Sequence, residues 1–214
     1  MNWDAPDFPK DKQINENVVL LILAGPECEM GREPLAWEGY PATGKASDFQ
    51  VEKGQPPRTA QAWKVALNAA IHNAGKQNVE IDYLIHDAGA VSPESSDRIG
   101  PMAQALTTES PEFDFFRQAF NTSSLLGEMG AGTALTNVAL AIAYANHLGK
   151  KVLVAGTTDL QNPTAVMVLP PAQAHRIDET LDWFQADPNK QQEQFLPWWG
   201  LRHDAPALLQ GYSE

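Results

Sequence analysis

The sequence predicts an α/β protein with a mixed sheet and flanking helices. Short apolar runs alternate with helical patterns as far as residue 150, which is typical of a sheet covered by helices. Two further apolar runs, 152–156 and 164–169, are separated by a polar turn, which favours an antiparallel pair. The alternation and this closing pair together indicate a sheet with both parallel and antiparallel neighbours.

Three regions of the chain differ in composition. The first 16 residues are rich in Pro, Asp, Lys and Asn, and the regular alternation is lost after Pro170 and Pro171. We therefore expect an N-terminal arm over 1–16, one α/β domain over 17–170, and a helical or irregular C-terminal tail over 171–214.

The composition also excludes several classes of function. A formal net charge of −12 over 214 residues repels phosphate groups, so we expect neither a nucleic acid nor a membrane as partner. Cys28 is the only cysteine, which excludes an intrachain disulfide. The start of the chain is polar and acidic, unlike a signal peptide, and no apolar run reaches membrane-spanning length. These features predict a cytoplasmic protein.

Each element of the first half has its own sequence signal. Residues 18–23, Val-Val-Leu-Leu-Ile-Leu, form a continuous apolar run that predicts a strand buried on both faces. A weaker strand is expected over 34–40, and 41–57 is expected to be a loop because it lacks periodicity. Residues 59–74 have an alanine-rich inner stripe and stop at Gly75, which predicts an amphipathic helix.

The middle of the domain continues the alternation. Residues 81–86 predict a strand, and Ser92 followed by Pro93 predicts the start of a helix that ends near Leu106. The aromatic stretch 113–120 is expected to be either an edge strand or a short helix.

The helix expected over 132–148 is the most informative element, because it is apolar nearly all round. Gly149, followed by two lysines, is a typical helix end. Such a helix must be covered on every side. In the tail we expect a short helix over 174–185, after which Trp198 and Trp199 either fold back on the domain or contact a partner.

The order of these elements resembles the C-terminal half of a thiolase-superfamily condensing enzyme of the β-ketoacyl synthase type. Residues 85–90, Ile-His-Asp-Ala-Gly-Ala, resemble the family's His-Gly-Thr-Gly-Thr segment. Residues 123–128 resemble its Lys-Ser-x-x-Gly-His segment, 162–166 the end of its glycine-rich turn, and 18–23 its first strand. The resemblance implies half of a thiolase-like fold, with 132–148 as the central helix.

The resemblance makes His86 the candidate catalytic residue, because the family's histidine faces the acyl pocket from this strand end. The chain departs from the family at Ser123, which replaces a lysine, and at Glu128, which replaces a second histidine. An ionised carboxylate at the latter position would repel an oxyanion. The nucleophilic cysteine of the family lies in its N-terminal half, so we expect that this chain alone does not condense acyl groups.

These residues also have structural interpretations. His86 can also be interpreted as a half-buried histidine that takes no part in chemistry. Glu128 can be interpreted as a negative charge that is favourable at the start of a helix. The other histidines are scattered without the spacing of ligands, so we expect no metal and no cofactor.

In a complete condensing enzyme the other half of the fold covers the second face of the central helix. The resemblance therefore implies that another chain covers it here, either a chain like the N-terminal half or a second copy of this one. The candidate partner-binding residues are Leu135, Val138, Ala139, Ile142, Trp198 and Trp199.

The leading functional hypothesis is a non-catalytic, thiolase-like interaction protein. Degenerate thiolase-like proteins of this kind occur beside bacterial type VI secretion genes, so the resemblance implies an accessory or adaptor factor for a secreted effector. The alternative is a subunit of a split β-ketoacyl synthase, in which a partner supplies the cysteine and this chain supplies His86. An isolated ligand-binding domain is a third hypothesis, without a motif to support it.

Overall fold

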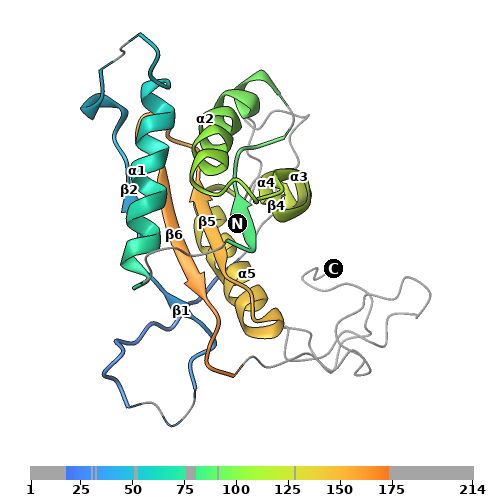
Figure 1. Ribbon diagram of the computed structural model, residues 1–214. Coiled ribbons are helices and arrows are strands. Elements are labelled where there is room, and N and C mark those ends of the chain that lie inside the picture. The colour runs from blue at the N-terminus through green and yellow to red at the C-terminus, as the bar shows by residue number, and fades with distance from the viewer. Residues whose placement is uncertain are drawn as a thin grey trace, which may run out of the picture. The chain divides into compact units, whose positions relative to one another are not determined.

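The computed structural model describes residues 18–173 except 30, 32, 51–52, 76–80, 91 and 128. These residues form a mixed sheet of six strands, in the order β1-β6-β5-β3-β4 with β2 also beside β6 (Figure 1). The strands are β1 (Trp37–Glu38), β2 (Ala42–Thr43), β3 (Tyr83–His86), β4 (Ala119–Asn121), β5 (Val152–Gly156) and β6 (Thr164–Leu169). The helices are η1 (Ala46–Asp48), α1 (Arg58–Asn73), α2 (Pro93–Glu109), α3 (Phe115–Gln118), α4 (Thr122–Leu126), η2 (Gly130–Gly132) and α5 (Thr133–Leu148). The predicted mixed α/β class is confirmed.

The pairing of the strands matches the expected mixture. β3 is parallel to both β4 and β5, whereas β5 and β6 form the predicted antiparallel pair, with Ala155 opposite Ala165. β1 and β2 both lie antiparallel to β6, and between them the Gly39 N–H donates to the Met167 carbonyl at 2.9 Å. The weak strand expected over 34–40 is therefore the first part, β1, of one interrupted edge strand. The second part, β2, falls in the stretch 41–57, for which the sequence predicts a loop.

The prediction of a buried strand at 18–23 is wrong. This stretch belongs to no strand of the described sheet, and Val18 and Ile22 are 98% and 88% exposed. The physical reason is that β1 and β2 already occupy the free edge of β6. Leu21 alone among the leucines of this run is half-buried, against the face of the sheet that α5 covers.

Helices α1 and α2 cover one face of the sheet, in front of the strands in Figure 1. Trp63 and Leu67 of α1 pack with Met102 and Leu106 of α2, and all four side chains are at most 2% exposed. The Ser92 hydroxyl accepts the Ser95 N–H at 3.1 Å, which confirms the predicted cap. Helix α2 continues three residues beyond its predicted end.

Helix α5 covers the opposite face. Val138, Ala141 and Ala145 pack against sheet residues that include Ile85 and Val154. The helix ends where the sequence predicts, because Gly149 adopts the left-handed conformation, with φ 64°. Within the described ranges, no helix combines the length and the hydropathy that crossing a bilayer requires.

The predicted aromatic stretch resolves into both of its expected forms, the short helix α3 and the edge strand β4. The predicted N-terminal arm, Glu128, and the tail from residue 174 onward, with Trp198 and Trp199, lie outside the described residues. The expectations for those positions stay predictions.

Candidate functional site

Polar side chains gather where the parallel strands β3, β4 and β5 end. His86 closes β3 and lies opposite Asn121, which closes β4. Asp87 and Thr157 follow the ends of β3 and β5, and Thr122 begins α4. The carboxyl edge of parallel strands is where α/β proteins usually place ligand sites, so we describe these groups in turn.

His86 is almost completely buried, with 2% of its surface exposed. Its Nδ1 accepts the Ala88 N–H at 3.4 Å, and its ring lies 6.1 Å from the Phe115 ring, between centroids. Burial lowers the pKa of His86 to about 4, and the neighbouring Asp87 charge offsets only part of this effect. The imidazole is therefore neutral at pH 7 and is shielded from bulky substrates such as acyl thioesters.

The depressed pKa of His86 predicts a loss of stability in mild acid. The unfolded chain takes up this proton near pH 6.5 and the folded chain only near pH 4, so stability is complete above 6.5 and falls as the pH drops toward 4. The full effect is ~3 kcal/mol, from 1.36 kcal/mol for each pKa unit. We expect the urea midpoint of His86→Gln to change less than that of the wild type between these pH values. Parallel pH profiles for the two proteins would contradict the assignment.

Thr122 connects three elements at this edge. Its hydroxyl lies 3.1 Å from the His86 carbonyl oxygen and 2.7 Å from Oδ1 of Asn137, which is 1% exposed on α5. Buried polar groups that satisfy each other in this way hold elements in one arrangement. The sequence signal for this contact was present, because Asn137 is a rare amide in an otherwise apolar helix, but its partner Thr122 could not be deduced.

Asp87 fastens the end of β3 to the loop after β5. Its Oδ1 accepts the Thr157 N–H at 2.7 Å and the Thr157 hydroxyl at 2.8 Å, and its Oδ2 accepts the Thr158 hydroxyl at 3.1 Å. Ser123, where the sequence resemblance predicts a lysine, is 6% exposed within α4. The polar cluster is thus bonded to itself, which suits a structural connection better than acid–base chemistry on a substrate.

The structure separates the predicted partner-binding residues of α5 into two groups. Val138 is 8% exposed and packs on the sheet, so it is unavailable to a partner in this arrangement. Leu135 is 48% exposed, and Ala139 and Ile142 are half-buried. Leu148, the last residue of the helix, is 56% exposed, but it lies two turns after Ala141, on the face that packs on the sheet. Leu135 and the exposed Ala143 show that the side of α5 away from the sheet lacks cover from the described part of the chain.

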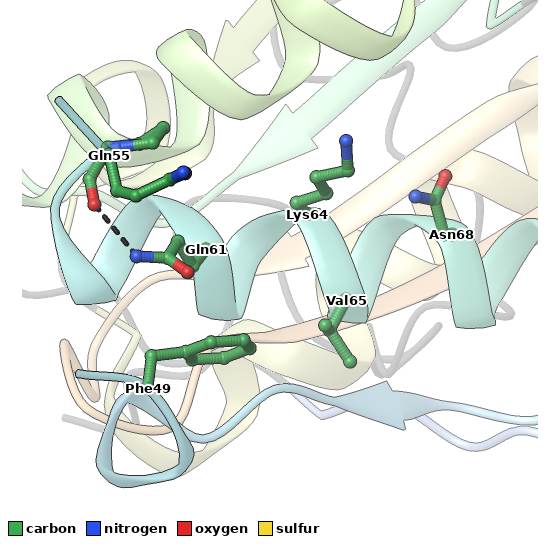
Figure 2. A pocket seen from close by; sticks show the side chains of 7 residues that line it. Phe49, Gln55, Gln61, Lys64, Val65 and Asn68 are labelled. Carbon is green, nitrogen blue, oxygen red and sulfur yellow. Dashed lines mark hydrogen bonds between the residues drawn. The ribbon is translucent and has the colours of Figure 1, made fainter. Parts of the chain in front are cut away.

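A separate hollow lies beside α1, on the other side of the sheet (Figure 2). Its volume is about 450 Å3, and its lining includes Phe49, Val65 and Lys64; Figure 2 shows Val65 on the side of α1 that faces Phe49. Lys64 already forms an ion pair with Glu109 at 2.9 Å, and the amide of Gln61 donates to the Pro56 carbonyl at 2.9 Å. Among the residues that the structure describes, no three His, Cys, Asp or Glu side chains are grouped to hold a metal ion.

Comparison with known families supplies the assignment. Residues 43–170 match the family model of the type VI lipase adapter protein Tla3, C-terminal. The chain belongs to this family. The match begins at the last residue of β2 and runs past the end of β6, so it includes His86, the Thr122–Asn137 contact and α5 and leaves out β1. A comparison with curated protein sequences found no match.

The described fold of this Tla3 C-terminal family member is also similar to solved condensing enzymes. The ishigamide ketosynthase/chain length factor is 20% identical over 66% of this chain and 37% of its own, with a TM-score of 0.47. The PfaC keto synthase–chain length factor is 16% identical over 67% of this chain and 14% of its own, with a TM-score of 0.49. Human mitochondrial 3-ketoacyl-CoA thiolase is 14% identical over 64% of this chain and 31% of its own, with a TM-score of 0.43. The chain spans at most 37% of the length of these proteins.

Proposed function

We propose that this chain is a non-catalytic adaptor that binds a type VI lipase effector and that its helix α5 pairs with that other chain. The observation that carries the proposal is the uncovered side of α5. A helix that is apolar nearly all round is stable in water only when both sides are covered, and the sheet covers one. Leu135 is 48% exposed and Ala143 is exposed on the side that the sheet does not cover.

The free energy gained by covering this side of α5 supports pairing with another chain. Complete burial of a leucine side chain contributes ~2 kcal/mol, so covering the half-exposed Leu135 and the alanines beside it favours association. A second copy of this chain is a less suitable cover, because it brings the same net charge of −12 to the interface. The effector named by the family is the partner that we favour, and it meets the adaptor in the cytoplasm before export.

The environment of His86 supports binding rather than chemistry. A catalytic histidine must touch the reacting group, and this imidazole is 2% exposed. Ser123 stands where the resemblance to condensing enzymes implies a lysine. These two features argue against the split β-ketoacyl synthase that we considered as the alternative.

The proposal is tested with the purified full chain and a purified type VI lipase effector from the same secretion gene cluster. We expect a saturable complex by isothermal titration calorimetry, and no covalent acyl adduct by mass spectrometry after incubation of that complex with acyl-CoA or acyl-carrier thioesters. Absence of binding would contradict the adaptor role. An acyl adduct on either chain would contradict the non-catalytic role.

A further inference from the structure

The described residues cover the segment Val18–Leu23 on one side only. Val18, Leu20 and Ile22 are between 83% and 98% exposed, whereas Leu21 between them is half-buried. Leu21 packs against the same apolar cluster as α5. Alternate side chains therefore lie on opposite sides, as they do in a β-strand.

Within the described residues, no strand lies beside this segment. It belongs to no helix or strand, and none of the backbone hydrogen bonds found among the described residues joins it to the sheet. A run of apolar residues on both sides of a strand is stable when both sides are covered. The described residues cover the side that carries Leu21 and leave the opposite side and the backbone for a partner.

The charges that follow the segment indicate what kind of partner fits. Residues 18–40 contain four glutamates and one arginine, a net charge of −3. Glu27, Glu29, Glu33 and Glu38 are all exposed. Opposite charges across an interface favour the encounter of the correct partners and disfavour wrong ones. A second copy of this chain would bring the same acidic segment, and the two segments would repel each other. The favoured partner therefore carries Lys or Arg beside its binding strand.

We propose that Val18–Leu23 pairs, as an added β-strand, with an edge strand of the lipase effector that has basic residues beside it. Val18, Leu20 and Ile22 cover apolar side chains of that strand, and the four glutamates meet the basic residues. This inference rests on the proposed function, because it takes the effector to be the partner of the adaptor. It adds a second contact next to the one on α5.

The test uses the full chain and the purified lipase effector. The double variant Leu20→Asp/Ile22→Asp changes only exposed side chains, so its melting temperature should equal that of the wild type. We expect it to raise Kd at least about 10-fold, whereas Val65→Asp, at a 44% exposed position on α1, leaves Kd within about twofold. We also expect the amides of residues 18–23 to exchange hydrogen more slowly in the complex. Glu27→Lys/Glu29→Lys should weaken binding and reduce its dependence on salt.

The outcomes separate this inference from the proposed function. If the double variant binds like the wild type, or the amides of 18–23 are unchanged in a complex that does form, the added strand is wrong and the adaptor role stands. If the double variant alters only self-association, the occupant is a second copy and the inference is overturned. If the wild type does not bind the effector, both proposals are wrong.

Discussion

Replacing Gly44 with alanine is expected to destabilise the protein by ~3 kcal/mol or more, the largest effect that we predict for any single methyl group. A Cβ at this position would collide with the carbonyl oxygen of Ala62 in α1. Neither group can move easily, because the Gly44 N–H donates to the Pro163 carbonyl at 3.1 Å and Ala62 is completely buried. Urea unfolding of the purified variant measures the loss.

Gly100→Ala is the matched control for this prediction. Gly100 lies inside α2, and apart from its two chain neighbours an added Cβ there meets no atom within 4 Å. Alanine favours a helix interior over glycine, but a Cβ next to the ring of Pro101 disfavours the helical backbone, so we expect this variant to stay within ~1 kcal/mol of the wild type. Equal unfolding midpoints for Gly44→Ala and the wild type would mean that the edge strand and α1 do not pack as the structure has them.

Leu135→Glu is expected to abolish binding of the partner without affecting the fold. The side chain is 48% exposed, so a carboxylate there remains hydrated in the free chain, but burial under a partner leaves the charge unpaired. We expect Kd to rise at least about 30-fold, which corresponds to ~2 kcal/mol, measured by isothermal titration calorimetry with the lipase effector.

Val65→Glu controls for the added charge and for general solubility effects. Val65 is 44% exposed and lies on α1, which covers the opposite face of the sheet from α5. Its affinity for the effector should stay within about twofold of the wild type. If both variants bind equally well, the outer side of α5 is not the interface.

The sequence predicted elements whose signals are local. The helix cap at Ser92, the helix end at Gly149 and the two apolar runs that become β5 and β6 each depend on a few neighbouring residues, and the structure has all three. The apolar pattern of α5 also indicated a helix that needs cover on both sides. These features could be predicted because their causes lie within one or two turns of chain.

Features that depend on distant parts of the chain could not be predicted in this way. Residues 18–23 have the pattern of a buried strand. Which segment occupies the edge of the sheet, however, depends on the pairing of β1 with β6. The paired residues Trp37 and Leu169 are more than 130 residues apart in the chain. The Thr122–Asn137 contact likewise depends on how α4 and α5 meet. The burial of His86 follows from the packing of α3 beside β3, which no local motif encodes.

The central claim is that another chain covers the outer side of α5. A photoreactive amino acid introduced in place of Leu135, in the full chain mixed with the lipase effector, tests it most directly. We predict a cross-link from this position to the effector, mapped by mass spectrometry, and none from the same group in place of Val65. A complex that forms while position 135 cross-links only to its own chain would contradict the claim.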